Sequence, residues 1–103
     1  MTLDVPRAEP DPHEARHRLE HARASRLAQL RALDDGGQAA EDHLLSEQRS
    51  AMRRALREID EAFGRIEQGT YGTCLGCGRP IPAERLEILP YTRHCVACQR
   101  RAL

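Results

Sequence analysis

Two Cys-x-x-Cys pairs are the residues of this 103-residue chain whose spacing could do chemistry. The four cysteines are Cys74, Cys77, Cys95 and Cys98. A two-residue spacer lets both thiolates of a pair converge on one ion, and Zn²⁺ prefers four such ligands in a tetrahedron. Gly76 and Gly78 give the first pair the backbone freedom that a tight turn needs. We therefore predict one structural zinc ion, bound in a site without an open position.

Two other uses of cysteine were weighed. Disulfide bonds are disfavoured because the sequence shows neither an apolar leader nor a membrane span, and we expect the protein in the reducing cytoplasm. A redox Cys-x-x-Cys pair normally opens a helix in a βαβ unit, which the sequence lacks. Zinc is the interpretation that fits the spacing best.

Histidines are the other potential ligands. His13, His17 and His21 are spaced about one helical turn apart and could bind a transition metal, but such a row is more often an exposed helix face. His94 stands next to Cys95, and we expect it to be exposed because four thiolates already complete the zinc shell. With the one convincing metal site closed, we expect no enzymatic activity.

Composition restricts the partners and the size of the core. Sixteen basic residues, all arginine, balance sixteen acids, so the net charge does not indicate nucleic-acid binding. Direct contact with nucleic acid ranks last among the hypotheses, and we expect no sequence-specific DNA binding. One Phe, two Tyr and no Trp are too few for a large core. This composition favours a helical hairpin stapled by a metal-held module.

Two long helices are predicted before the cysteines. The first begins with Asp11 as N-cap, with Glu14 completing a capping box, and ends near Leu33 before two glycines. The second covers residues 38–68, with Asp35 and Gln38 at capping-box spacing, and Gly69 ends it. The short link between them makes the helices antiparallel neighbours.

The second helix carries a heptad pattern. Leu45, Met52, Ile59 and Ile66 recur every seven residues, and Ala55 and Ala62 occupy the other seam position. This period predicts a coiled-coil seam. Gly64 interrupts the helix at a cost of about 1 kcal/mol relative to Ala, and indicates local weakness or close packing.

The predicted fold is therefore mainly α: an antiparallel two-helix coiled-coil hairpin attached to a small four-cysteine zinc finger. Residues 1–10 are expected to form a flexible arm and residues 11–69 the hairpin, with its tip near 34–37. Residues 70–103 are expected to form the zinc finger and a short C-terminal helix that begins near Cys95.

The run RIEQGTYGTCLGCGRPIPAERLEILPYTRHCVACQ, residues 65–99, closely resembles the DksA/TraR family of zinc-finger proteins, and the helix from about Leu44 matches in pattern. The resemblance implies a bacterial transcription regulator that binds RNA polymerase. In that family the coiled coil enters the secondary channel of the enzyme, and its tip approaches the catalytic magnesium. Some members act jointly with guanosine tetraphosphate, but no residue for that effector can be matched in this sequence.

The tip is where the sequence departs from the family pattern. The family carries two Asp separated by two residues and then an Ala. Counting back from Cys74 places Arg31, Asp34 and Gly36 at these positions, so one of the three is kept. We carry over Asp34 as a partner-binding residue and add Asp35 for its charge. The alternative is a zinc-stapled coiled-coil interaction module with a different partner, or one that dimerises through its seam.

Overall fold

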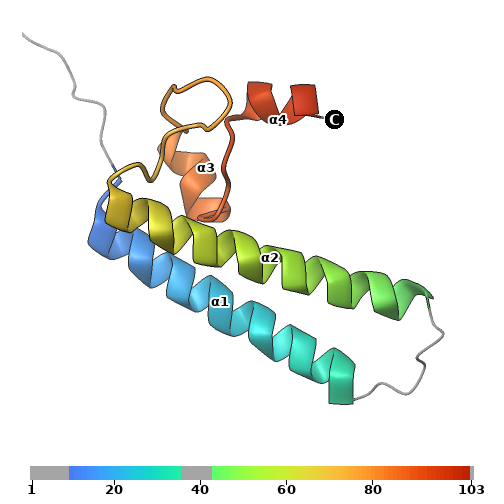
Figure 1. The fold of residues 1–103 in the computed structure, drawn as a ribbon. Coiled ribbons are helices and arrows are strands. Elements are labelled where there is room, and N and C mark those ends of the chain that lie inside the picture. The colour runs from blue at the N-terminus through green and yellow to red at the C-terminus, as the bar shows by residue number, and fades with distance from the viewer. Residues whose placement is uncertain (1–9, 36–42, 103) are drawn as a thin grey trace, which may run out of the picture.

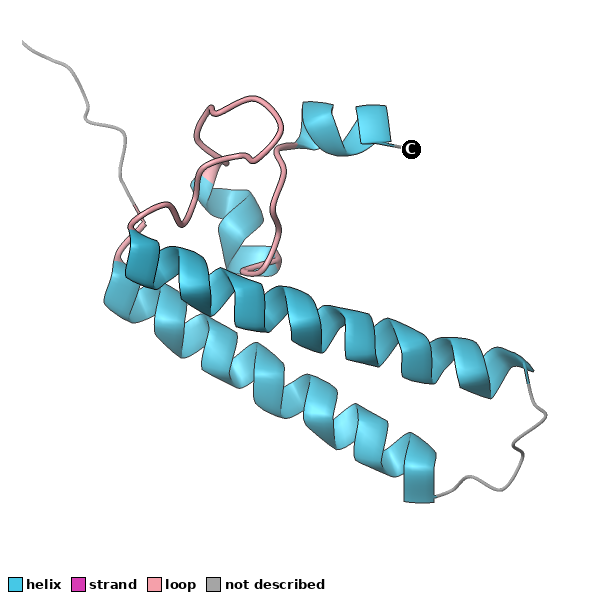
Figure 2. Ribbon diagram, viewed as in Figure 1, coloured by secondary structure: helices cyan, strands magenta, loops and turns pink. Residues whose placement is uncertain are grey.

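The computed structural model describes residues 10–35 and 43–102, and its elements are shown in Figure 1. Four helices follow one another along the chain: α1 Pro12–Asp35, α2 His43–Gln68, α3 Ala83–Ile88 and α4 Val96–Ala102. Figure 2 shows helices and loops but no strand within these ranges. Extended pairing there is limited to one bridge, between Thr73 and Pro80. The predicted mainly helical fold is confirmed, with α1 and α2 forming the hairpin and the cysteine module at its base.

Helix α1 begins where its sequence predicts. The carboxylate of Asp11 accepts a hydrogen bond of 3.0 Å from the amide of His13, as an N-cap residue does. Pro12 takes the first helical position, where no amide hydrogen is needed. The carboxylate of Glu14 lies 3.4 Å from Arg18 in an i, i+4 ion pair. Glu14 therefore supports the helix through Arg18.

The end of α1 differs from the prediction. The helix continues to Asp35, two residues beyond the expected end at Leu33. Arg49 of α2 donates to the carbonyl oxygen of Leu33 at 3.2 Å and to the carboxylate of Asp34 at 2.9 Å. A guanidinium at this end satisfies an unpaired carbonyl and complements the helix dipole. Asp35 is the last residue of α1, and its predicted role as a cap of the second helix depends on residues outside the described ranges.

Helix α2 is described from His43, and its end at Gln68 agrees with the prediction. Gly69 adopts a φ of 80°, its amide bonds to the carbonyl of Ile66, and the amide of Thr70 bonds to that of Arg65. This pair of bonds is a Schellman motif. Parts of several predictions lie outside the described residues: the arm over 1–9, the tip over 36–37, the helix start at Gln38, and Leu103.

The predicted seam is buried most completely near the module. Leu19 of α1 and Ile59 and Ala62 of α2 have no exposed surface, and Ala15 is 1% exposed. The seam residues nearer the tip are only half-buried: Leu27, Leu30, Leu33, Leu45 and Met52. The hairpin is therefore anchored at its base, since burial of apolar surface is the main favourable contribution to stability.

Two tyrosines join the module to this core. Tyr71 and Tyr91 pack against the cluster of Leu19, Ile59 and Ala62. The hydroxyl of Tyr71 donates to the carbonyl oxygen of Pro90 at 2.7 Å, and burial raises the pKa of Tyr71. Arg26 of α1 donates to the hydroxyl of Tyr91 at 3.3 Å. The hairpin and the module consequently share one buried cluster.

Gly64 provides a test of helix propensity. A Cβ added at Gly64 would meet nothing within 4 Å, so close packing does not explain this glycine. We expect Gly64→Ala to stabilise the chain by about 0.5–1 kcal/mol, because alanine loses less backbone entropy on forming a helix. Urea unfolding of the zinc-loaded chain would measure the change.

Gly69→Ala is the matched control, because the same added methyl group falls at a φ of 80°. That variant should be destabilised, since a residue with a β-carbon is strained at this positive φ. Equal effects of the two substitutions would contradict the helix-propensity explanation.

Candidate metal centre

The first cysteine pair lies in a tight turn that the Thr73–Pro80 bridge closes. The amide of Cys74 donates to the carbonyl of Arg79 at 2.8 Å, and the amide of Gly78 donates to that of Cys74 at 2.9 Å. Gly78 has a φ of 76°, so the turn uses the conformational freedom expected of it. Gly76 has a different reason: an added Cβ would lie 3.0 Å from the sulfur of Cys98. Gly76 is small because the second cysteine pair approaches its backbone.

The second pair is held by the start of α4. Cys95 directly precedes this helix, and its carbonyl accepts the amide of Gln99 at 2.9 Å. Cys98 lies within the first turn, so the spacer of two residues brings both thiols to the same side. The expected C-terminal helix is thus present over Val96–Ala102.

Helix α3 is an element that sequence reasoning missed. Pro82 precedes it, and its carbonyl accepts the amides of Arg85 and Leu86 at 3.0 and 3.2 Å. A proline followed by Ala-Glu is a helix-start signal that could have revealed it. Leu86 is 2% exposed and packs with Cys74 and Ile81 in a small core of the module.

The four cysteines meet in space. The sulfur atoms of Cys74, Cys77, Cys95 and Cys98 all lie within 4.8 Å of one another. Zn–S bonds of about 2.3 Å in a regular tetrahedron require sulfur separations of about 3.8 Å. The sulfurs of Cys77 and Cys95 are 3.9 Å apart, close to this value. Both the number and the spacing of the donors suit one structural Zn²⁺ ion.

Charge explains why these thiols need a cation. Burial raises the pKa of the Cys74 thiol, but backbone amides outweigh burial and lower it to about 6; those of Gly76 and Cys95 lie 3.3 Å from the sulfur. The hydrogen bond with Cys74 raises the pKa of Cys98 to about 12. A thiolate at one cysteine therefore disfavours ionisation of the neighbouring thiols, because the like charges would lie close together. A divalent ion removes this conflict and lets all four deprotonate.

His94 is partly buried, so the expectation that it would be exposed is wrong. Its carbonyl oxygen accepts hydrogen bonds from the side chains of Arg85 and Thr92, at 3.0 and 3.2 Å. These contacts hold the backbone of His94 against α3, next to Cys95. The main chain of His94 therefore helps to hold the metal site in place.

The histidine row forms no second cluster in the part of the chain that the structure describes. His17 and His21 line a shallow pocket that Glu87 also borders. Within residues 10–35 and 43–102, the four cysteines are the one group of three or more metal-binding side chains whose ligand atoms meet. The interpretation of the row as an exposed face agrees with this placement.

The acids predicted for the tip differ in their surroundings. The carboxylate of Asp34 forms an ion pair of 2.9 Å with Arg49 across the hairpin. Asp35 follows at the end of α1 and is exposed. Sequence reasoning missed Arg49, since nothing local indicates that its side chain reaches the last turn of the other helix.

The described part of the chain contains no helix that is both long enough and apolar enough to cross a membrane. A two-helix hairpin with a four-cysteine module at its base defines the molecule as a zinc-finger protein of the coiled-coil type. Residues 69–102 match the model of the prokaryotic dksA/traR C4-type zinc finger.

Known proteins agree with this class. An uncharacterised protein of Aquifex aeolicus is 43% identical over 65 residues, which cover 63% of this chain and 45% of that protein. The RNA polymerase-binding transcription factor DksA of Caulobacter vibrioides is 40% identical over 53 residues, covering 52% and 37%. The solution structure of the DnaK suppressor protein of Agrobacterium tumefaciens superposes with a TM-score of 0.67 at 26% identity, over 96% of this chain and 100% of that one.

Residues 69–102 therefore form a zinc finger of the dksA/traR type, and the chain is similar to DksA proteins in sequence and in its hairpin fold. The matches to these two curated relatives span less than half of each relative's own length.

Proposed function

We propose that this chain is a transcription regulator that binds RNA polymerase through the secondary channel, with the hairpin as the inserted part. The observation that carries the proposal is a DksA/TraR-type zinc module at the base of a two-helix hairpin. The name of the Caulobacter vibrioides relative, which describes polymerase binding, supports it. The protein would act in the cytoplasm as a binding protein without enzymatic activity.

In this proposal the four cysteines ligate one zinc ion, and the zinc is structural. Its ligand set is complete, so no coordination position is left for a substrate or a water molecule. The hairpin of residues 11–69 reaches the partner, and the module of residues 70–103 braces it. Guanosine tetraphosphate is a candidate joint effector on the polymerase, and direct sequence-specific binding to DNA is not part of the proposal.

The described end of the hairpin favours Asp35 over Asp34 as the acid that meets the partner. Both acids are exposed, but the carboxylate of Asp34 lies 2.9 Å from Arg49, which offsets part of its charge. A carboxylate without such a partner keeps its charge available to a metal-containing or arginine-lined cavity. With Arg31 where the family has an aspartate, polymerase binding is expected to be kept and the effect on initiation altered.

Retention of the zinc-loaded chain on immobilised core RNA polymerase at physiological salt tests binding. In vitro transcription from a ribosomal promoter, with and without guanosine tetraphosphate, tests the effect of Asp35→Asn. We expect this variant to be retained on the polymerase and to lose most of its effect on transcription. Asp60→Asn is the matched control, since Asp60 is an exposed acid of α2 that pairs with Arg23 at 3.3 Å, away from the tip.

Each result decides between the proposal and its alternative. If the wild-type chain is not retained, the different-partner alternative is favoured and the polymerase proposal fails. If Asp60→Asn reduces the effect as much as Asp35→Asn, general charge and not the tip is responsible. The ion pair of Asp34 is the specific observation that favours the alternative, because it engages an acid that the family pattern presents to the polymerase.

A further inference from the structure

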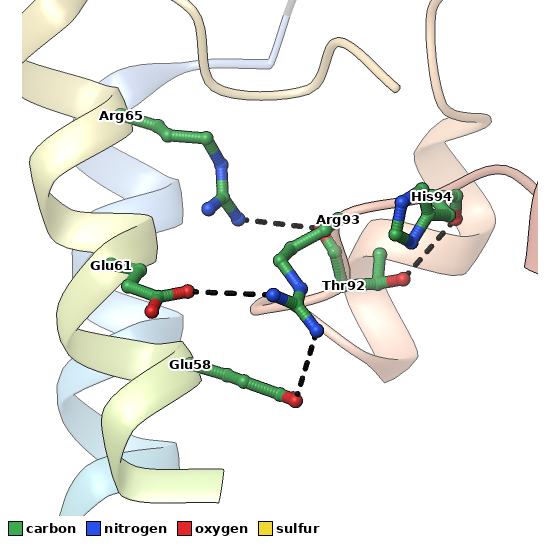
Figure 3. A network of polar contacts seen from close by, with 6 residues as sticks. All are labelled: Glu58, Glu61, Arg65, Thr92, Arg93 and His94. Carbon is green, nitrogen blue, oxygen red and sulfur yellow. Dashed lines mark hydrogen bonds and ion pairs between the residues drawn. The ribbon is translucent and has the colours of Figure 1, made fainter. Parts of the chain in front are cut away.

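Helix α2 uses two adjacent faces. Ile59, Ala62 and Ile66 face α1 in the seam. Each of the residues just before them, Glu58, Glu61 and Arg65, falls on a neighbouring stripe with spacing i, i+3, i+7, which aligns side chains along a helix. This second stripe consists of charged residues and is turned toward the zinc module (Figure 3).

Arg93 of the module reaches back to this charged stripe. One terminal nitrogen of its guanidinium lies 3.4 Å from a carboxylate oxygen of Glu58, and the other lies 3.7 Å from Glu61. Figure 3 shows the guanidinium between the two carboxylates. The forked shape of arginine allows one side chain to contact both acids.

Arg65 makes the reciprocal contact from α2. It is 8% exposed, and a terminal nitrogen donates to the carbonyl oxygen of Thr92 at 3.4 Å. Burial lowers the pKa of Arg65, while the nearby carboxylate of Glu61 opposes that shift. A guanidinium removed from water must have partners to compensate its lost hydration, and Thr92 supplies one from the module.

The segment Thr92–Arg93–His94 also meets the rest of the module. The carbonyl of Arg93 accepts the amide of Leu75, which lies in the first cysteine pair, at 2.9 Å. The carbonyl of His94 accepts Arg85 of α3 at 3.0 Å. The next residue is Cys95. This segment of three residues therefore links α2, α3 and both cysteine pairs.

We propose that Arg65 and Arg93 form a latch that sets the direction in which the zinc module projects from the hairpin. They act as positioning residues: their contacts lie between the two parts and outside the cluster of sulfurs. The latch goes beyond the proposed function, because it concerns how the module is held on the hairpin. It rests on the proposed function only for the measurement of polymerase binding. A partner that touches both the module and the tip requires their relative direction to be fixed.

The test measures orientation in the absence of any partner. Residual dipolar couplings of the zinc-loaded, isotope-labelled full chain report whether the hairpin and the module align as one body. We expect the couplings of the wild type to fit one common alignment, and those of the module in Arg93→Glu to fit a different direction relative to the hairpin, with one zinc per chain and unchanged helicity in both. Arg79→Glu is the matched control, because Arg79 is an exposed arginine of the same module.

Charge exchange distinguishes a latch from a general structural role. Combining Arg93→Glu with Glu58→Arg restores one pair of opposite charges and leaves Glu61 beside Arg65, so the wild-type direction of the module should return. If Arg93→Glu loses zinc, the variant Arg93→Gln is measured in its place, because glutamine removes the ion pairs without adding an acid. The proposal is overturned if the module of a zinc-loaded Arg93 variant keeps its wild-type direction, or if the exchanged variant does not regain it.

Polymerase retention of the same variants is a separate measurement. A changed module direction together with weaker retention supports the latch as part of the proposed function. A changed module direction with a wild-type chain that is not retained leaves the latch supported and the proposed function rejected. The two failures are thus distinguishable.

Discussion

Replacing Cys74 with serine is expected to abolish zinc binding and unfold the module after residue 70, while the hairpin stays partly helical. Cys74 is 1% exposed, and its sulfur accepts the amides of Gly76 and Cys95 at 3.3 Å. The fully buried residues with which it packs are only Ile81 and Leu86, as far as the described chain shows. A core this small does not fold without a staple, so the binding free energy of zinc is folding free energy here.

The hairpin should also respond, at its base. Tyr71 and Tyr91 leave the shared cluster when the module unfolds, which exposes part of Leu19 and Ile59. The half-buried seam residues toward the tip cannot replace that burial. We therefore expect a partial loss of helicity, larger than the contribution of the short helices α3 and α4 alone.

Metal analysis by mass spectrometry, far-UV circular dichroism and protease mapping would test this result. Leu75→Ser is the control: it introduces the same residue next to Cys74, at a side chain that is 56% exposed. This control should retain one zinc ion and resist protease. A protected module in Cys74→Ser would show that four thiolates are not required.

Ile59→Ala is expected to destabilise the zinc-loaded chain by about 2–5 kcal/mol, the range for deleting a buried isoleucine side chain to the β-carbon. Ile59 has no exposed surface and packs with Leu19 and Ala62 at the base of the hairpin. The loss combines the transfer free energy of the deleted groups with the cavity that remains. For a small domain with a total stability of about 5–15 kcal/mol this is a large fraction.

Ile88→Ala makes the same chemical change at a side chain that is 78% exposed. It should alter the unfolding free energy by no more than about 0.5 kcal/mol. Urea unfolding followed by circular dichroism, at fixed zinc concentration, would compare the two variants. Equal effects would mean that the seam around Ile59 does not carry the stability of the hairpin.

The ends of α1 and α2 show which features of the fold can be predicted from local sequence signals. The start of α1 at Pro12 and the end of α2 at Gln68 follow from signals within a few positions, an N-cap aspartate and a C-terminal glycine. The two further residues of α1, Asp34 and Asp35, could not be predicted in this way. They are supported by Arg49, which lies on the other helix and is brought close only by folding.

The heptad pattern predicted which residues form the seam but not how completely each of them is buried. Ile59 and Leu45 occupy equivalent heptad positions, yet Ile59 is fully buried and Leu45 only half-buried. The difference arises because Tyr71 and Tyr91 cover the base of the hairpin, and they come from a segment that follows α2. Periodicity describes one helix, whereas burial depends on everything packed around it.

By itself, the sequence predicted the group of four cysteines, the two long helices and the resemblance to the DksA/TraR family. Each of these depends on residue types at short, fixed spacings: two Cys-x-x-Cys pairs, caps and a seven-residue period. Only the tertiary structure showed that Asp34 is paired with Arg49, and that Arg65 and Arg93 join the module to the second face of α2. Those contacts join residues 15 to 35 positions apart. Short sequence spacings do not predict them, because the packing of the helices brings the partners together.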